Sequence, residues 1–270
     1  DSYLGLKTAA WALIRSANAT SVQVVDRIGP QSVVDLAERL GVLSPLSAVP
    51  SIALGSSEVS VIDLVTAYGS IANYGLRLTP TFITRIVDRN TDAELFQHRP
   101  APTPVVDPVH AYSVLRLLQN VVDRGTGSAV RRLGYTGAAA GKTGTTNDNT
   151  DAWFTGFTPD YVASVWIGFD TRKGNRRLVD RHTRQQITGG SGAAPIWTTF
   201  MTSVNPNPSG SFTAPAGVVE QVIDPFTGLD PALIDSPTVR PITIALPEGT
   251  RPSTAADVDS VVSMRETVQD

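Results

Sequence analysis

The spacing of apolar residues predicts a series of amphipathic helices along the chain. Residues 29 to 41 start with Gly-Pro, keep apolar side chains at helical spacing and stop at a glycine, so both ends of this helix are marked. The same period predicts helices over 7 to 15, 56 to 75, 109 to 123 and 194 to 204, of which the second starts with serine caps. The side chains expected to face the core are Val33, Val34, Leu36, Ala37, Leu40, Ile62, Val65, Tyr68, Ile71, Ala72, Tyr112, Leu115, Leu118 and Val122.

The period changes to strand-like patterns in the second half of the chain. Residues 151 to 170 hold two runs of β-branched and aromatic side chains around Thr158-Pro159-Asp160, which predicts an antiparallel hairpin. Between about 205 and 252 the proline density rises, and pieces such as "RPITIAL" (240 to 246) predict an extended segment before a polar tail. Helices followed by antiparallel strands predict an α/β domain of the α+β type.

The composition is that of a globular protein. With 270 residues, 41% of them hydrophobic and 17% charged, the chain has room for one large domain and a small addition, which we expect at residues 1 to 205 and 206 to 270. A net charge of -3 gives no general attraction to nucleic acid, and no run of 18 apolar residues predicts a membrane span. Without cysteine, and with His98, His110 and His182 lacking metal-ligand spacing, the sequence predicts no metal, no cofactor and no Ser-His-Asp triad.

Lys142, one of three lysines in the chain, allows two interpretations. Gly141-Lys142-Thr143 matches the end of a phosphate-binding P-loop, whereas Lys142-Thr143-Gly144 matches a strand motif of serine acyl-transferases. A P-loop needs a glycine five positions before Gly141, where this chain has Thr136, and a helix after the lysine. The residues that follow, "TGTTNDNT", form a turn-rich polar stretch, so the P-loop interpretation fails.

A strand accounts better for the residues around Lys142. Alternation would place Thr143 and Thr145 on one face and Lys142 and Gly144 on the other. Two hydroxyls would then face a cleft, and the glycine would let a neighbouring backbone approach closely. Ser16-Ala17-Asn18, just after the first predicted helix, has the form of a second motif of the same acyl-transferases, S-x-N.

Further stretches continue this likeness in the order of the family. They are "ALGSSEVSVIDLVTAYGSIANYG", "DRGTGSAV", "AGKTGTTNDNTDAWFTGFTPDYVASVWIGFD", "TGGSGAAPIW" and "IDPFTGL". Over residues 3 to about 230 the chain resembles the class A, bifunctional penicillin-binding proteins, in the C-terminal part of their transpeptidase domain. The resemblance implies the penicillin-binding (β-lactamase-like) fold, in which an antiparallel sheet holding Lys142 and the 151 to 170 hairpin is covered by helices.

One family motif is missing. No serine in the chain is followed three positions later by lysine, and the nearest forms, Ser113 to Arg116 and Ser128 to Arg131, end in arginine, which does not deprotonate to act as a base. In the family, the S-x-x-K serine lies on a helix some tens of residues before S-x-N. We therefore expect the nucleophile in a part of the same protein that precedes Asp1.

The resemblance implies roles in catalysis and substrate binding for Ser16, Asn18 and Lys142. Ser16 would pass a proton to the departing amine, and Lys142 would stay cationic and hold the Ser16 hydroxyl. Asn18 would donate its side-chain amide to the substrate backbone. We therefore expect Lys142 to meet Ser16 and Asn18, with about 3 Å between its ammonium and the Ser16 hydroxyl.

The strand residues would bind the terminal carboxylate and the reacting carbonyl oxygen of the substrate. The resemblance places the terminal carboxylate of the substrate, or that of a β-lactam, on the hydroxyls of Thr143 and Thr145, with Gly144 between them and Thr146 beside them. The backbone N–H of Thr145 would form half of an oxyanion hole, and the missing serine would supply the other half.

Three further segments have two interpretations each. "DRGTG" (123 to 127) is more simply a helix stop and turn than a contact site. "TGGSG" (188 to 192) is equally a loop before a helix and a border of the cleft. The basic run from 171 to 184 is most simply a solvated hairpin arm, with docking to an anionic wall polymer as the alternative.

The function that the resemblance implies is peptidoglycan D,D-transpeptidation. The partners would be stem peptides ending in D-Ala-D-Ala, β-lactam antibiotics as covalent inhibitors, the missing N-terminal part of the same protein and other cell-wall synthesis proteins. The intact protein would act outside the cytoplasm, anchored to the membrane, and carry a glycosyltransferase domain. The alternatives are a non-catalytic β-lactam-sensing or scaffold module, and a D,D-carboxypeptidase or β-lactamase of the same fold.

Overall fold

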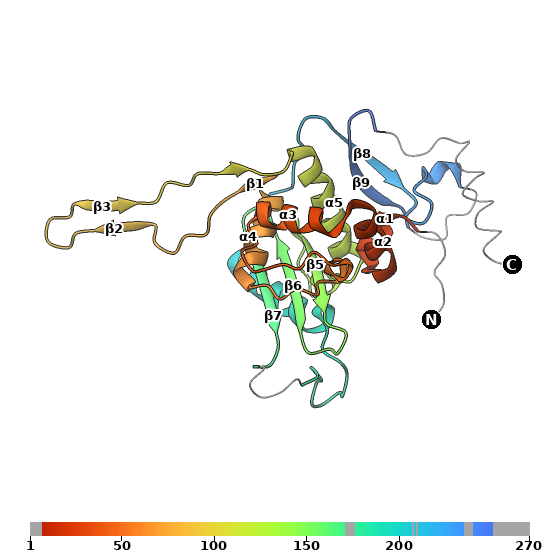
Figure 1. The fold of residues 1–270 in the computed structure, drawn as a ribbon, viewed down its shortest axis with the longest axis horizontal. Helices are drawn as coiled ribbons and strands as arrows, with labels where there is room; N and C mark the ends of the chain where they lie inside the picture. Colours follow the sequence, from red (N-terminus) through yellow and green to blue (C-terminus); the bar gives the residue numbers. More distant parts are fainter. Residues whose placement is uncertain (1–6, 171–175, 207, 209, 235–239, 251–270) are drawn as a thin grey trace.

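The computed structural model describes residues 7–170, 176–206, 208, 210–234 and 240–250. A three-stranded sheet stands at the centre with helices around it, a two-stranded arm extends from one side, and a second hairpin packs on the other side (Figure 1). Within the described residues, no helix is both long and apolar enough to cross a membrane. The predicted polar tail at 253 to 270 lies outside the described residues.

Four α-helices and a short 3-10 helix make up the first part of the chain. They are α1 (Ala9–Arg15), α2 (Asn18–Ile28), α3 (Pro30–Leu40), η1 (Pro50–Leu54) and α4 (Val61–Ala72). The start and stop signals predicted for α3 are confirmed, because Pro30 is its first residue and Gly41 ends it at a φ of 108°. The serine cap predicted for α4 is present, but the helix starts later than position 56, at a capping box of Ser60 and Asp63.

The predicted inward faces of these helices are correct only in part. On α3, Val34 is buried as expected, whereas Leu36 is 39% exposed. On α4, Tyr68 and Ile71 pack against the core, but Ile62 is exposed. On α4, the capping box buries the side chain of Asp63, so the preceding residue, Ile62, faces outward.

The central sheet has the order β5-β6-β7 and is antiparallel throughout. Its strands are β5 (Ala140–Thr145), β6 (Ala152–Phe157) and β7 (Val162–Ile167). The hairpin predicted over 151 to 170 is confirmed, with Thr158 and Tyr161 closing its turn through a backbone hydrogen bond of 2.8 Å. In this order β5 is an edge strand, so one of its sides has no strand partner.

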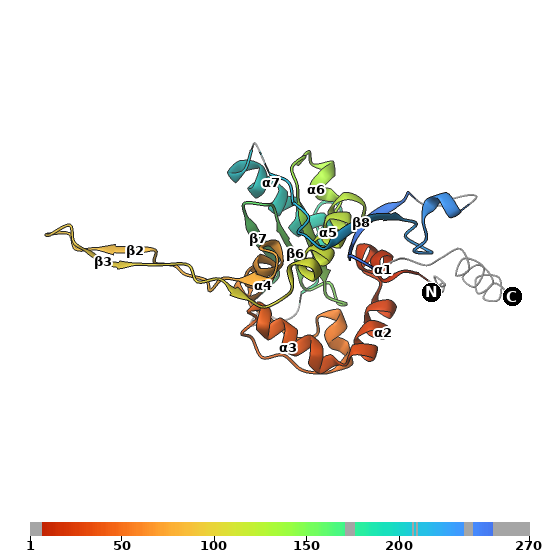
Figure 2. The same ribbon diagram turned by 90° about the horizontal axis from the view of Figure 1, so that it is seen from above.

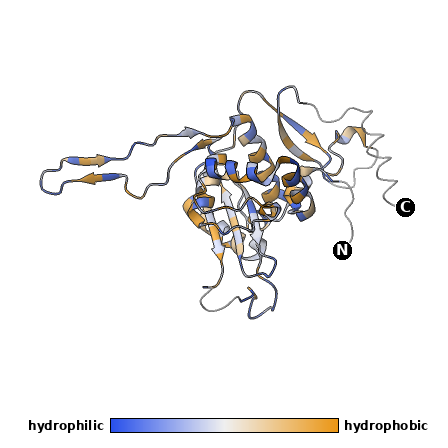
Figure 3. Ribbon diagram, viewed as in Figure 1, coloured by the Kyte–Doolittle hydropathy of each residue, from blue (hydrophilic) through white to orange (hydrophobic). Residues whose placement is uncertain are grey.

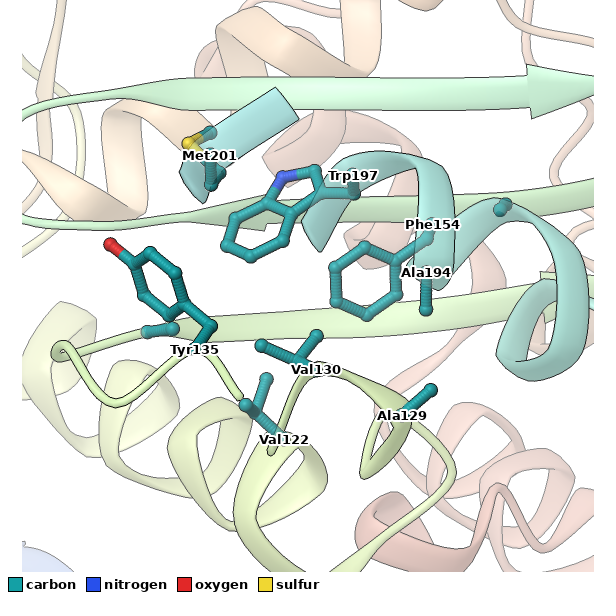
Figure 4. Packing of buried hydrophobic residues seen from close by; sticks show 10 residues of the cluster. Val122, Ala129, Val130, Tyr135, Phe154, Ala194, Trp197 and Met201 are labelled. Carbon is teal, nitrogen blue, oxygen red and sulfur yellow. The ribbon is translucent and has the colours of Figure 1, made fainter. Parts of the chain in front are cut away.

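Helices cover both faces of this sheet. Phe154 and Phe157 are fully buried and three positions apart, so strand alternation puts them on opposite faces. Phe154 packs with Trp197 of α7 (Ala194–Val204) and Val130 of α6 (Ala129–Arg132), as Figure 4 shows. Phe157 packs in a second cluster with α4 and α5 (Pro108–Arg124), which holds the buried residues Tyr112, Leu115 and Leu118. The fourth predicted core residue of α5, Val122, is also buried but belongs to the cluster of Phe154.

Before α7 the chain forms one short turn of π-helix, η3 (Gly189–Ala193). Thr188 and Ser191 close this turn as a reciprocal capping box. A side chain at Gly189 would lie only 2.3 Å from Trp153 O and 2.6 Å from Gly144 O. The absence of a side chain therefore lets this turn lie directly against the backbone of the sheet.

The predicted extended segment forms a hairpin that packs on the helices. Its strands β8 (Val218–Ile223) and β9 (Ile242–Pro247) pair antiparallel, and the short helix η4 (Pro231–Leu233) lies between them. Ile223 and Ile242 join Ile14 of α1 and Val121 of α5 in one buried cluster. At the turn after β8, Pro225 O accepts a hydrogen bond of 2.5 Å from the Thr8 hydroxyl. The extension thus reaches both α5 and the start of α1.

A two-stranded arm leaves the body between α4 and α5 (Figures 1 and 2). Its paired strands are β1 (Leu76–Arg77) with β4 (Thr103–Pro104) and β2 (Arg85–Val87) with β3 (Glu94–Gln97). Apolar residues lie in both outer strands, as Figure 3 shows, and Leu95 is 64% exposed. Nothing in the sequence pattern predicted this arm.

Candidate functional site

The two predicted motifs meet at the unpaired side of β5. The ammonium of Lys142 donates a hydrogen bond of 2.8 Å to Ser16 Oγ across 126 sequence positions. It also donates a bond of 3.0 Å to the carbonyl of Thr143. The expected approach of Lys142 and Ser16 is confirmed, and Figure 1 shows β5 on the side of the sheet nearest α1 and α2.

Ser16 is held in an uncommon backbone conformation. It caps the end of α1 with φ 57° and ψ 47°, a left-handed geometry that costs a residue other than glycine about 1 kcal/mol or more. The backbone N–H groups of Ser16 and Ala17 donate to Leu13 O and Ala12 O, which fixes this turn. The exposed Ser16 side chain is therefore presented by a rigid helix end and not by a loose loop.

Asn18 lies close by in sequence but shares no hydrogen bond with the lysine among the described residues. It is the first residue of α2, its side chain is exposed, and the hydrogen bonds of the Lys142 ammonium go to Ser16 and Thr143 instead. The expected meeting of Lys142 with Asn18 therefore stays a prediction.

The register of the sheet turns the backbone N–H groups of Gly141, Thr143 and Thr145 away from β6. The N–H of Thr146 donates to Asp151 O, so these two residues form a hydrogen-bonded pair of the antiparallel ladder. Such pairs alternate with pairs that share no hydrogen bond, so Gly144 and Lys142 bond to β6, whereas Thr145 and Thr143 do not. The N–H of Thr145 and the carbonyl of Thr143 therefore point away from β6. The carbonyl of Thr143 accepts from Lys142 on that side, in agreement with this alternation.

The two threonine hydroxyls of β5 both have a partner from another segment. Thr143 Oγ1 lies 2.6 Å from Thr126 Oγ1, in the turn after α5. Thr145 Oγ1 accepts a hydrogen bond of 3.0 Å from the N–H of Gly189, at the start of η3. Both partners belong to segments that the sequence marked as ambiguous, "DRGTG" and "TGGSG".

Gly144 and Thr146 hold the neighbouring backbone in place. The backbone of Gly189 packs directly against that of Gly144, but it is the missing side chain of Gly189 that permits this approach, since a Cβ at Gly144 would instead meet the side chain of Trp153 at 3.2 Å. The hydroxyl of Thr146 accepts from the N–H groups of Thr150 and Asp151 and so closes the turn between β5 and β6. In this structure, Thr146 builds the turn beside the two hydroxyls of β5.

Burial changes the acidity of the lysine at this site. The side chain of Lys142 is half-buried, and the loss of solvation lowers the pKa of its ammonium from 10.5 to about 8. The lysine is therefore still mainly cationic at neutral pH. It keeps the charge that holds the Ser16 hydroxyl, but it titrates closer to neutrality than an exposed lysine.

The described part of the basic run forms a turn anchored near the site. Leu178 is buried, and its backbone N–H and carbonyl bond to Asn149 O and Asn149 Nδ2 at 2.7 and 2.6 Å. Val179 and Gln186 form an isolated bridge, and Arg181 and Arg184 are exposed. The run is thus a solvated turn over 176 to 184, while 171 to 175 lie outside the described residues. Among the described residues, no three His, Asp or Glu side chains gather as metal ligands.

Comparison with known proteins decides the family. A family model described as the penicillin binding protein transpeptidase domain matches residues 2–201. The chain belongs to this family. Penicillin-binding protein 1A of Rickettsia bellii is 34% identical over 249 residues, which cover 84% of this chain and 30% of that protein. Its counterpart in Neisseria meningitidis is 38% identical over 205 residues, 74% of this chain and 24% of that protein. The class A resemblance is confirmed, and the chain spans about a quarter to a third of these relatives.

Solved structures share the fold of this transpeptidase chain. Penicillin-binding protein 1A from Haemophilus influenzae has a TM-score of 0.75 at 22% identity and covers 92% of this chain and 41% of its own. PonA1 from Mycobacterium tuberculosis, solved in complex with penicillin V, has a TM-score of 0.67 at 27% identity, with coverages of 77% and 58%. The expected α+β fold, an antiparallel sheet covered by helices, is therefore confirmed. The S-x-x-K serine of the family is not among these 270 residues.

Proposed function

We propose that this chain forms part of a serine D,D-transpeptidase that cross-links peptidoglycan stem peptides ending in D-Ala-D-Ala. The observation that carries this proposal is the 2.8 Å contact between the Lys142 ammonium and Ser16 Oγ. A hydroxyl held by a cation on a fixed helix end is suited to deliver a proton at hydrogen-bond range. The family supports the reaction class, since the chain belongs to the penicillin-binding transpeptidases.

The proposed reaction is acyl transfer through a serine ester. The S-x-x-K serine, supplied by a part of the protein outside this chain, attacks the carbonyl of the penultimate D-Ala and its lysine takes the proton. The C–N bond then breaks, and the departing D-Ala amine receives a proton through Ser16. An amine of a second stem peptide attacks the ester, restores the serine and forms the cross-link. Lys142 stays cationic during these steps and orients Ser16.

The other groups of the site would bind the substrate. Thr145 N–H, unpaired on the free side of β5, supplies one oxyanion donor. The hydroxyls of Thr143 and Thr145 bind the terminal carboxylate, and Asn18, exposed at the start of α2, donates to the substrate backbone. β-Lactams carry a carboxylate and a reactive amide, so they acylate the same serine.

The proposal places the intact protein outside the cytoplasm. Its curated relatives are penicillin-binding proteins 1A, and the class A resemblance implies a membrane-anchored enzyme that acts outside the cytoplasm. An anchoring segment and a glycosyltransferase domain would belong to the full-length protein, together with contacts to other wall-synthesis proteins. Residues 1 to 205 would form the transpeptidase unit, with 206 to 270 as its extension.

Fluorescent penicillin tests the proposed chemistry. The full-length protein should be labelled covalently, and the isolated 270-residue chain should not, because the acylated serine is absent from it. With a stem-peptide donor and an amine acceptor, the full-length protein should form the cross-linked dimer. Stable labelling of the isolated chain, or no labelling of the full-length protein, would refute this mechanism.

Two other functions share the same fold. A sensing or scaffold module would bind β-lactam without turning over stem peptides. A D,D-carboxypeptidase or β-lactamase would release D-Ala or hydrolysed β-lactam without a dimer. The three activities differ in product, so mass spectrometry of the same reaction mixture separates them. The description of the matching family model, the penicillin binding protein transpeptidase domain, favours the transpeptidase.

A further inference from the structure

The turn that carries Thr126 is fixed by contacts with several elements at once. Its backbone N–H donates to Ile14 O near the end of α1, at 3.3 Å. A side chain at Gly125 would lie 2.4 Å from the same Ile14 O, and one at Gly190 would lie 2.7 Å from Thr126 O. Thr126 is thus held between the helix that presents Ser16, the strand β5 and the turn η3. Such packing is more than a helix stop requires.

The hydroxyls of Thr126 and Thr143 carry two protons, of which only one is used in the hydrogen bond between them. Their oxygens are 2.6 Å apart, so one hydroxyl donates to the other, and neither has another hydrogen-bond partner among the described residues. When Thr126 donates, the proton of Thr143 is left to point outward. Thr126 and Thr143 are only half-buried, so this proton is within reach of a ligand.

The hydroxyl of Thr145 also accepts a hydrogen bond from another segment, in this case from a backbone N–H group. Its oxygen accepts the N–H of Gly189 at 3.0 Å, and within the described part of the chain its own proton has no acceptor. Its side chain is exposed. With Thr126 as the donor of its pair, both β5 hydroxyls receive a hydrogen bond from another segment and can each donate one. Two neighbouring donors match a carboxylate, which only accepts, better than a neutral ester or amide.

We propose that Thr126 is a positioning residue for substrate selection, which turns Thr143 into a hydrogen-bond donor and makes the site prefer a free carboxylate. This inference rests on the proposed function, since the ligand is the terminal carboxylate of a stem peptide or β-lactam. In the chain Thr126 to Thr143 to carboxylate, each hydrogen bond polarises the next, which strengthens the last one. Gly189 N–H performs the same task for Thr145.

The test compares benzylpenicillin with its methyl ester in the full-length protein. The second-order acylation rate constant is measured for the parent protein and for Thr126→Val, Thr126→Ser and Thr155→Val. Thr155→Val is the matched control, since it removes a hydroxyl from a similar pair with Ser164, at 2.7 Å, on the neighbouring strands. Thermal unfolding of each variant shows that it is folded, and Thr126→Ala replaces the valine variant if that one is not.

The expected result is a selective loss. Thr126→Val should slow acylation by the free acid about tenfold and leave the slow reaction of the ester within about twofold, because only the acid uses the Thr143 proton. Thr126→Ser should restore the parental preference, and Thr155→Val should keep it. An equal loss for acid and ester, or an unchanged acid rate, would overturn the role of Thr126 while leaving the transpeptidase assignment intact. A parent protein that is acylated by neither compound would overturn both.

Discussion

The hydroxyl of Thr8 donates a 2.5 Å hydrogen bond to Pro225 O, joining the start of α1 to a turn 217 positions further along the chain. Next to this contact, the rings of Trp11 and Phe226 lie 5.9 Å apart. The turn itself is held by Asp224, whose buried carboxylate accepts from the N–H groups of Phe226 and Thr227. The extension thus braces one end of the helix whose other end presents Ser16.

Phe226→Ala should therefore weaken both the fold and the site. Loss of the aromatic contact should lower the free energy of unfolding by about 1 to 3 kcal/mol. Acylation should slow several-fold because α1 no longer fixes Ser16. Denaturant unfolding and penicillin acylation of the full-length protein measure the two effects. Leu233→Ala, an exposed residue of the same extension, is the control. A destabilised variant with parental acylation would show that the brace does not reach Ser16.

Lys142→Ala should disable the chemistry without unfolding the protein. Removal of a positioned cation should slow acylation by roughly 10² to 10⁴. The fold should survive, because the lost group is a polar end at the sheet edge and not core volume. The control is Arg89→Ala, which removes an exposed cation from the region of the arm. An alanine variant that acylates at the parental rate would contradict the role given to Lys142.

The pH dependence of acylation should report Lys142. Because burial lowers the pKa of this lysine to about 8, its ammonium loses its proton as the pH rises through that value. The acylation rate should then fall on the alkaline side of about pH 8. Lys142→Arg, which stays charged, should lack this decline whatever its absolute rate. A parental profile that remains flat to pH 10 would exclude Lys142 as the titrating group.

Asp63 should govern the acid stability of the α4 region. Burial alone would raise its pKa, but hydrogen bonds from the Ser44 hydroxyl, Leu43 N–H and Ser60 outweigh burial and hold it far below the ordinary value near 3.8. A carboxyl with a lowered folded-state pKa stabilises the fold above its unfolded pKa, and this contribution is lost as the pH falls below about 4.

Asp63→Asn should thus cost about 1 to 3 kcal/mol of unfolding free energy at pH 7, since an amide has one acceptor oxygen for four donors. The difference from the parent should shrink as the pH is lowered from 5 to 3. Urea unfolding across this range measures it. Asp92→Asn, exposed at the tip of the arm, is the control. A difference that is constant with pH would mean that Asp63 is not ionised in the folded protein.

Local patterns predicted those elements whose signals are complete within a short window. Helix α3 has both Pro30 and Gly41, and the β6 and β7 hairpin has two apolar runs around a turn, so each was found with nearly correct bounds. The arm was missed because its apolar residues are exposed in both strands. Two-residue strands such as β1 also leave too short a pattern to recognise.

The site was predictable only as far as the motifs extend. The meeting of Lys142 with Ser16 followed from family resemblance and is present in the structure. The parts played by Thr126 and Gly189 depend on how three separate segments pack around β5, which no local pattern contains.

The distance in sequence between Thr8 and Pro225 also sets the order in which the site is assembled. At about 5 to 20 residues per second, a ribosome makes Pro225 roughly 10 to 40 s after Thr8. During this delay α1 lacks the turn that braces it, and for much of it Ser16 has no lysine to meet. The growing chain therefore carries no finished site, and on the proposed function a β-lactam present during synthesis would meet its target only after nearly all of this chain has been made.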